Sequence, residues 1–178
     1  MVYYADSDIL IRDMEERDAE IFPVGERAQG WLDSSADKFE MRLAHVREGK
    51  CVSLVAEYRE NAAGYVNVYP DCQWGALGGQ GLCEIVDFAV LEKYRRLGVG
   101  SRLMDVAERI AFTYADKVYL GVGLHCGYGP AQRMYVRRGY IPDGSGVWYG
   151  SKVCEPYADC KNDDDLNIYL MKYRDEDK

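Results

Sequence analysis

Long apolar runs and a basic leader are both missing from this sequence. No stretch approaches the ~18 consecutive apolar residues that a membrane-spanning helix requires. The first residues, MVYYADSDILIRD, carry acidic side chains early and lack the basic start and apolar core of a secretory signal. We therefore expect a cytoplasmic protein that does not associate with membranes.

Metal-binding and disulfide patterns are missing as well. The chain has only two histidines, His45 and His125, and its six cysteines form no C-x-x-C pair. The cysteines are Cys51, Cys72, Cys83, Cys126, Cys154 and Cys160. Scattered cysteines in a cytoplasmic chain favour reduced, mostly structural thiols. We expect neither a disulfide framework nor a metal site.

Basic residues are scarce, because 22 Lys and Arg against 30 Asp and Glu give a formal net charge of −8. Nucleic acid is therefore not expected as a partner, since phosphate binding requires a basic face. A cationic ligand suits this chain better, although an acidic surface that only maintains solubility explains the charge equally well. The length of 178 residues, without a repeat or low-complexity linker, predicts a single domain over residues 1–178.

Strand and helix patterns alternate in a single pass through the chain, and their periodicity sets the expected elements. The first half predicts a strand Ile9–Arg12, a helical stretch from about Glu15 followed by a Gly/Pro-containing segment around Pro23–Gly30, a helix Ser35–Glu48, and strands Cys51–Arg59 and Gly64–Tyr69 around a turn at Asn61–Ala63. After a glycine-rich connection, the second half predicts a central strand Leu82–Val90, helix Gly100–Ala115, strand Val118–Leu124, helix Ala131–Arg138, and an antiparallel pair Val147–Val153 and Leu166–Met171. This order indicates a mixed α/β fold.

The most specific motif is Arg95-Arg96-Leu97-Gly98-Val99-Gly100-Ser101, which follows a buried strand and opens a helix. Glycines at Gly98 and Gly100 let the backbone present several N–H groups to an anion, and the start of the helix adds about half a positive charge. Four cations, at Lys93, Arg95, Arg96 and Arg102, are concentrated here in an acidic chain. The motif predicts a site for a polyanionic cofactor, with a solvated strand-to-helix turn as the alternative.

Two other phosphate-binding motifs are disfavoured. A Walker loop requires G-K-[ST], which does not follow here, and a Rossmann fingerprint requires a third glycine and an early strand. The expected cofactor is therefore neither a nucleoside triphosphate nor a dinucleotide.

The R-x-x-G-x-G motif, followed some thirty residues later by A-x-x-x-Y-x-x-x-G-Y, resembles the GCN5-related N-acetyltransferase (GNAT) family over Leu82–Tyr140. The resemblance implies a single-domain acyl-CoA N-acyltransferase fold with a mixed central sheet of about six to seven strands, splayed fourth and fifth strands, and about four helices. It also implies acetyl-CoA as co-substrate. A homodimer is left open.

The resemblance assigns the cofactor-binding residues. Loop amides over Leu97–Arg102 would hold the pyrophosphate, and the pantetheine arm would lie along Phe88–Val90, with a backbone N–H polarising the thioester carbonyl. Tyr128 stands where the family often has asparagine. The expected cofactor-binding residues are Phe88, Ala89, Val90, Arg95, Arg96, Leu97, Gly98, Val99, Gly100, Ser101, Arg102, Tyr128 and Tyr135.

Acetylation of an alkylamine benefits from a general base, because freeing its lone pair at neutral pH costs about 4.6 kcal/mol. Glu84 matches the offset of the family's catalytic glutamate and is the first candidate; Asp87 is the second. Strand alternation places the two on opposite faces, unless a bulge intervenes. A carboxylate paired with a core arginine is the alternative for Glu84.

Tyr135 matches the family's tyrosine, whose hydroxyl would protonate the departing thiolate; a core aromatic is the alternative. Acidic segments around Asp13–Glu20 and Glu155–Asp165 match the family's acceptor side and would attract a small cationic amine; solvated loop charge is an equal alternative. Two rival functions stay open: a non-catalytic acyl-CoA sensor, and transfer of a larger acyl group.

Overall fold

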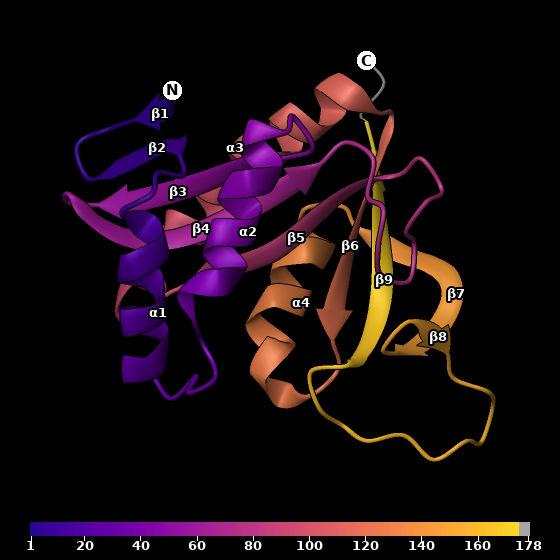
Figure 1. The fold of residues 1–178 in the computed structure, drawn as a ribbon. Coiled ribbons are helices and arrows are strands. Elements are labelled where there is room, and N and C mark those ends of the chain that lie inside the picture. Colours follow the sequence, from indigo (N-terminus) through magenta and orange to yellow (C-terminus); the bar gives the residue numbers. More distant parts are fainter. Residues whose placement is uncertain (175–178) are drawn as a thin grey trace. The chain divides into compact units, whose positions relative to one another are not determined.

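The computed structural model describes residues 1–174 (Figure 1). These residues divide into two compact units. The first unit comprises Met1–Tyr69 and Ile85–Thr113, and the second comprises Pro70–Glu84 and the described residues from Tyr114 onward. Within the described residues, no helix combines the length and apolar character needed to cross a membrane.

The first unit is built on five neighbouring strands in the order β1-β2-β3-β4-β5. They are β1 (Val2–Ala5), β2 (Ile9–Asp13), β3 (Val52–Tyr58), β4 (Asn61–Tyr69) and β5 (Cys83–Val90). The first four pair in antiparallel fashion. The sequence missed β1, because this edge strand has no buried residue and therefore no apolar pattern.

The β3–β4 turn lies two residues earlier than expected. Arg59 and Glu60 form it, with φ angles of 47° and 67°, and Tyr58 pairs with Asn61. Two successive positive φ angles are typical of a type I′ turn, whose twist matches that of the strands. The predicted turn at Asn61–Ala63 was wrong because the residues that adopt these angles are not the usual Asn or Gly.

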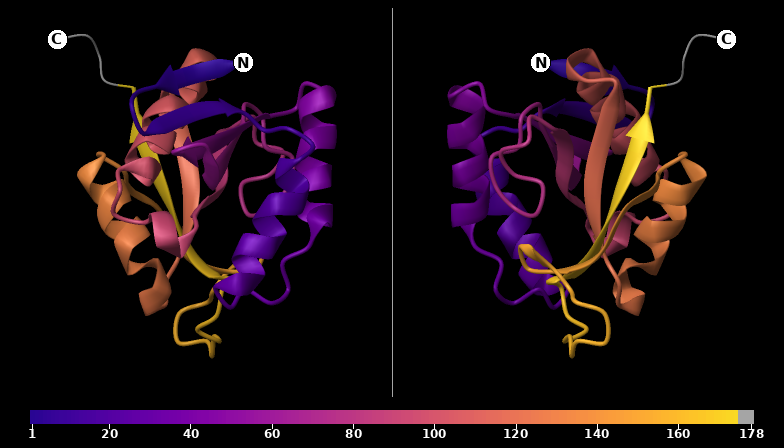
Figure 2. Two further views of the ribbon diagram at one scale, coloured as in Figure 1. Left: turned by 90° about the vertical axis from the view of Figure 1, so that its left-hand side faces the viewer. Right: turned by 90° about the vertical axis from the view of Figure 1, so that its right-hand side faces the viewer.

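Two helices cover one face of this sheet and a third covers the other (Figure 2). They are α1 (Asp18–Ala28) and α2 (Ala36–Arg47) on one side, and α3 (Val99–Tyr114) on the other. Phe22, Phe39 and Tyr65 form the centre of the α1–α2 core, with ring centroids 4.8–5.6 Å apart. This burial keeps α1 helical through Pro23, into the Gly/Pro-containing segment that was expected to follow the helix.

The second unit is a mixed sheet in the order β5-β6-β9-β7-β8, with α4 (Gly129–Arg137) beside it. Its further strands are β6 (Lys117–Gly123), β7 (Ile141–Tyr149), β8 (Lys152–Val153) and β9 (Leu166–Tyr173). The start of β5 runs parallel to β6, pairing Cys83 with Val118, whereas β6–β9 and β7–β9 are antiparallel. Two 3-10 turns, Glu92–Tyr94 and Cys126–Tyr128, complete the elements.

The α/β class, the mixed sheet and the four α-helices are confirmed, while the strand number was too low. The described residues 1–174 form nine strands instead of about six to seven. One reason is that Val147–Val153 is not a single strand: it turns at Gly150, with φ 59°, and folds back so that Trp148 pairs with Val153. A two-residue return strand is too short to leave a periodic pattern.

Candidate functional site

The glycine motif lies at the junction of β5 and α3, inside the first unit. Arg96 and Gly98 have φ angles of 66° and 85°, so the backbone turns sharply before the helix begins at Val99. The N–H of Arg102 then bonds the Gly98 carbonyl at 3.1 Å. Because the first N–H groups of a helix have no intrahelical acceptor, this turn is suited to bind an anion.

Gly100 is required by the close approach of β5 to the helix start. A Cβ atom at Gly100 would lie 3.1 Å from Phe88 Cζ and 3.4 Å from a Val90 methyl carbon. The structure therefore brings together the two segments that the sequence assigned to the pantetheine arm and the pyrophosphate. Ala89, between them, packs on the α1–α2 core.

Two of the arginines in the motif are engaged locally. Arg95 donates from Nε to the Val90 carbonyl at 3.1 Å and from Nη1 to Glu92 at 3.2 Å. Arg102 pairs with Asp105 at 3.3 Å, one turn along α3. The charge of both arginines remains next to the turn, and the Arg95 contact also links the turn to the end of β5.

Arg96 differs from its neighbours. The side chain of Arg96 is exposed and pairs with no carboxylate among residues 1–174. The ammonium group of Lys93, by contrast, lies over the Tyr94 ring, 4.8 Å from its centroid. An exposed guanidinium beside open helix N–H groups fits a diphosphate well. The motif as a whole therefore fits the anionic part of coenzyme A.

Asp87 lies at an irregular point of β5. Its φ is 51°, which interrupts the strand alternation used to separate Asp87 from Glu84. Arg42 on α2 binds its carboxylate, and a further Arg42 nitrogen donates to the Tyr69 hydroxyl at 2.7 Å. Burial is the largest single influence and lowers the pKa of Arg42, but the charges and hydrogen-bond acceptors of Asp87 and Tyr69 together outweigh burial, and the pKa is raised.

Glu84 is buried in the second unit, at the start of β5. Its side chain is 6% exposed, and its register partner on β6 is Tyr119. Burial, followed by the charge of Glu84, raises the pKa of the neighbouring Cys83 thiol to about 12. This carboxylate thus lies within an apolar strand, as its expected role as a base requires.

Tyr135 is buried on α4 with its ring 5.8 Å from that of Tyr140. Burial is the main reason that its pKa is raised, with a smaller contribution from Tyr128. A phenol less acidic than a thiol, whose pKa is about 8.5, favours a hydrogen bond to a thiolate over full proton transfer. We infer that a catalytic Tyr135 would stabilise the leaving group mainly by hydrogen bonding.

Sequence reasoning missed a polar cluster in the second unit. Asp164 accepts hydrogen bonds from Tyr128 at 2.9 Å and from His125 Nε2 at 3.0 Å. The N–H of Gly127 donates to His125 Nδ1, which leaves Nε2 as the donor to Asp164. No local pattern signals this cluster, because Asp164 is 36 residues from Tyr128.

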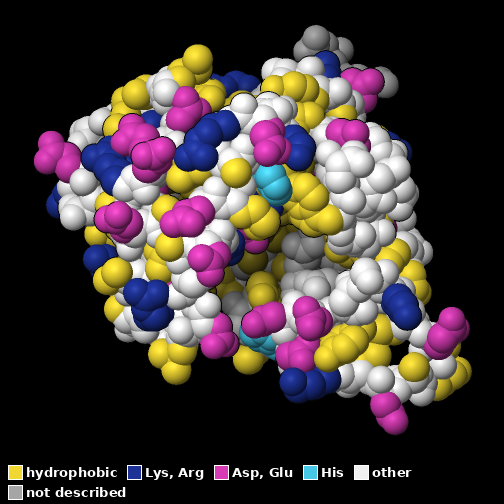
Figure 3. Space-filling model, viewed as in Figure 1, with side chains coloured by type: hydrophobic (Ala, Val, Ile, Leu, Met, Phe, Trp, Pro, Cys, Tyr) yellow, Lys and Arg dark blue, Asp and Glu magenta, His cyan; other side chains and the backbone are white. Residues whose placement is uncertain are grey.

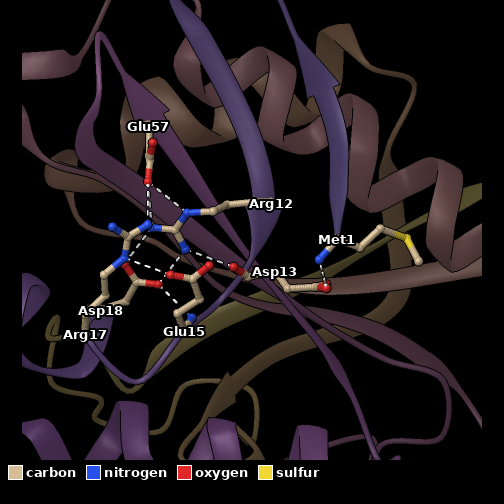
Figure 4. A network of polar contacts seen from close by, with 7 residues as sticks. All are labelled: Met1, Arg12, Asp13, Glu15, Arg17, Asp18 and Glu57. Atoms are coloured by element: carbon tan, nitrogen blue, oxygen red, sulfur yellow. Dashed lines mark hydrogen bonds and ion pairs between the residues drawn. The ribbon is translucent and has the colours of Figure 1, made fainter.

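The first acidic segment is largely neutralised by its own unit. Arg12 binds Asp18 at 2.7 Å and Glu57 at 2.8 Å, as Figure 4 shows. Burial lowers the pKa of Arg12, but the hydrogen bonds that Arg12 donates to Asp18 and Glu57 outweigh burial and raise the pKa, so the guanidinium stays charged. Acidic and basic side chains are intermixed over α1 and α2 (Figure 3). This segment offers less attraction to a cation than its composition predicted.

The second acidic segment is less neutralised. Lys161 pairs with Asp163 at 3.0 Å, whereas Glu155 and Asp159 are exposed. Within residues 1–174, no three His, Cys, Asp or Glu side chains are grouped so that they could hold a metal ion.

Comparisons with known proteins agree with this geometry. The family model described as Acetyltransferase (GNAT) family matches residues 11–140. An N-alpha-acetyltransferase of Sulfurisphaera tokodaii is 32% identical over 106 residues, which cover 55% of this chain and 61% of the relative. The match thus spans less than two thirds of that relative's length.

Solved structures share the fold over nearly the whole chain. An acetyltransferase of the GNAT family from Streptococcus pneumoniae superimposes with a TM-score of 0.66 at 17% identity, covering 94% of this chain and 99% of that one. A ribosomal-protein-alanine N-acetyltransferase from Brucella melitensis gives a TM-score of 0.66 at 16% identity, covering 92% and 99%. Because the family model matches residues 11–140, more than half of the chain, this chain belongs to the GNAT acetyltransferase family.

Proposed function

We propose that this protein transfers the acetyl group of acetyl-CoA to a primary amine. The observation that carries the proposal is the start of α3, where Gly98 and Gly100 open a helix directly beside β5. Helix N–H groups and the exposed Arg96 provide the donors that a diphosphate requires. Because the chain belongs to the GNAT family, we propose that this diphosphate is the one in coenzyme A.

Residues of β5 have the complementary role in this proposal. Phe88–Val90 would lie along the pantetheine arm, and a backbone N–H of Phe88 or Val90 would polarise the thioester carbonyl. The packing of Phe88 and Val90 on Gly100 supports this assignment, because it holds the strand and the phosphate-binding turn in one rigid piece.

Glu84 is proposed as the general base. The amine must lose a proton before or during its attack on the thioester, and a buried carboxylate accepts that proton directly or through a water molecule. Tyr135 is proposed to donate a hydrogen bond to the departing thiolate. Asp87 is a weaker candidate for the base, because Arg42 already binds its carboxylate.

The acceptor is proposed to be a small cationic amine. Support comes from the exposed carboxylates of the loop after β8, Glu155 and Asp159, rather than from α1. A second acceptor class, the α-amine of a peptide, is favoured by the similarity to an N-alpha-acetyltransferase. The two differ in basicity, because an α-amine has a pKa of about 8 and an alkylamine one of about 10.

A two-stage experiment tests the proposal. Calorimetry first measures acetyl-CoA binding by the wild-type chain and by Arg96→Gly, which removes the guanidinium at a backbone angle that glycine accepts. A thiol-release assay then compares polyamines, aminoglycosides, lysine peptides and peptides with free N-termini as acceptors.

Acetyl-CoA binding, weakened in Arg96→Gly, together with acceptor-dependent release of free thiol, is the expected result. Binding without release for any acceptor would favour the non-catalytic sensor. Absence of binding would overturn the proposal at its first step.

A further inference from the structure

Two cysteines of the second unit lie side by side on the surface. The Sγ atoms of Cys154 and Cys160 are 3.1 Å apart, with the Cys160 thiol directed at Cys154. Cys160 is exposed and Cys154 is partly exposed. By contrast, Cys51, Cys72 and Cys83 are buried, as structural thiols are expected to be.

The backbone between the two cysteines is folded so that its ends approach each other. The N–H of Ala158 bonds the Glu155 carbonyl at 3.1 Å, and Tyr157 has a φ of 66°. Proline at the second position of a turn and a positive φ at the third are features of a type II turn. The N–H of Cys154 bonds the Val147 carbonyl at 2.7 Å, which fixes this end of the turn to β7.

We propose that Cys154 and Cys160 form a redox modification site. Small organic disulfides would oxidise the two thiols to a reversible intramolecular disulfide bond. The turn already holds the sulfur atoms in contact, so closure requires only a small approach. The resulting ring would encompass residues 154–160. This inference replaces, for these two residues, the expectation of simple structural thiols, and it does not depend on acetyl transfer.

The exchange proceeds in two balanced steps. The Cys160 thiolate, the more exposed sulfur, attacks the small disulfide and forms a mixed disulfide, releasing one thiolate. The Cys154 thiolate then attacks the Cys160 sulfur, forming the internal disulfide and releasing the second thiolate. The two protons lost by the cysteines end on the two released thiols, and the small disulfide is the oxidant.

The surroundings of the pair suggest a neutral reagent. Glu155 and Asp159 are exposed on the same turn, and the exposed Lys152 and Lys161 flank it, so charges of both signs surround the pair. Uncharged 2-hydroxyethyl disulfide is neither attracted nor repelled by these charges and is the probe of choice.

The turn carries an aromatic side chain in full contact with solvent. Tyr157 has a relative exposure of 105%. A non-glycine residue at positive φ is strained, so the open turn is expected to fluctuate. Closing the ring would hold Glu155, Tyr157 and Asp159 in one conformation, because the cross-link removes alternative conformations of the loop.

The experiment uses the full chain and tryptic mapping. Trypsin cuts after Lys152 and Lys161, so both cysteines lie in one peptide, residues 153–161, while the exposed Cys126 lies in another. After treatment with 2-hydroxyethyl disulfide and alkylation, the expected 153–161 peptide has lost two hydrogens and carries no added group. Dithiothreitol should restore two alkylation sites.

Variants make the result specific. Cys160→Ser and Cys154→Ser should each leave a mixed disulfide on the remaining thiol, whereas Cys126→Ser should leave closure unchanged. Amide exchange over residues 155–160 should slow at least severalfold on oxidation. The proposal is overturned if both cysteines keep mixed disulfides, if both stay alkylatable, or if either pairs with Cys126.

Discussion

Two nitrogens of Arg42 donate hydrogen bonds to the same carboxylate oxygen of Asp87, Nε at 2.9 Å and Nη2 at 2.5 Å. The contact joins α2 to the irregular point of β5, just before Phe88. Because a third nitrogen of Arg42 binds Tyr69, three elements of the first unit meet at this guanidinium. The geometry favours a positioning role for Asp87 over proton abstraction.

Asp87→Asn should lower the free energy of unfolding by about 2 kcal/mol, because a charged hydrogen-bond acceptor is replaced by a neutral one beside a buried guanidinium. Asparagine tolerates positive φ, so the backbone at this position should not add to the loss. Urea unfolding with an unchanged m-value would measure it.

Asp8→Asn is the matched control, since Asp8 pairs with Arg59 at 2.7 Å but both side chains are largely exposed. Its effect should be no more than about 1 kcal/mol. Equal losses in the two variants would contradict a special role for the Arg42–Asp87 pair.

Gly100→Ala should weaken acetyl-CoA binding about tenfold or more, a loss of about 1.4 kcal/mol. The added Cβ would meet Phe88 Cζ at 3.1 Å and push the strand away from the helix start. Isothermal calorimetry of the wild-type and variant chains would measure the change in dissociation constant.

Gly129→Ala provides the comparison, because Gly129 is the first residue of α4 and a Cβ there meets no atom within 4 Å. It should stabilise the fold by about 0.4–1 kcal/mol and leave binding unchanged. If Gly100→Ala bound acetyl-CoA as tightly as Gly129→Ala, the assignment of the phosphate-binding turn would be wrong.

The sequence was informative wherever a local pattern carried the structure. The helix at α3 was predicted to within one residue at each end, because Leu103, Ala107 and Ile110 recur at helical spacing. The turn before it was identified because Gly98 and Gly100 perform a task that depends on glycine itself.

Long-range pairings could not be anticipated. Nothing near Asp87 in the sequence points to Arg42, 45 residues earlier, and nothing near Tyr128 points to Asp164. Acidic composition also gave no information on neutralisation, which depends on where Arg12 lies relative to Asp18 and Glu57. Such contacts join helices, strands and loops that are far apart in the sequence, so no local pattern signals them.

Glu84→Gln should reduce kcat for alkylamine acceptors by about 10²- to 10⁴-fold, because the amide cannot accept the amine proton. The loss should be smaller for an α-amine, which is less protonated at neutral pH. Steady-state rates with acceptors of graded pKa would reveal this dependence.

Glu108→Gln, which alters another buried glutamate, should keep the wild-type rate. An equal loss for weakly and strongly basic acceptors would argue that Glu84 positions the strand and does not abstract the proton.

Asp164 should titrate below its ordinary pKa of 3.8, because hydrogen bonds first from His125 and then from Tyr128 stabilise its charged form. A carboxylate with a depressed pKa in the folded state stabilises the fold above its unfolded pKa. This contribution is lost as the pH falls through the lower, folded value. Carbon NMR of the side-chain carboxyl would follow the titration.

Removing the two donors one at a time separates their contributions. His125→Ala should move the pKa of Asp164 upward more than Tyr128→Phe, because His125 is the larger cause of the shift. Tyr128→Phe leaves the His125 bond at 3.0 Å available, so part of the depression should persist. If neither variant changed the pKa of Asp164, the hydrogen bonds from His125 and Tyr128 to Asp164 would not form in solution. The loop that carries Asp164 would then not be held against the β6–α4 junction.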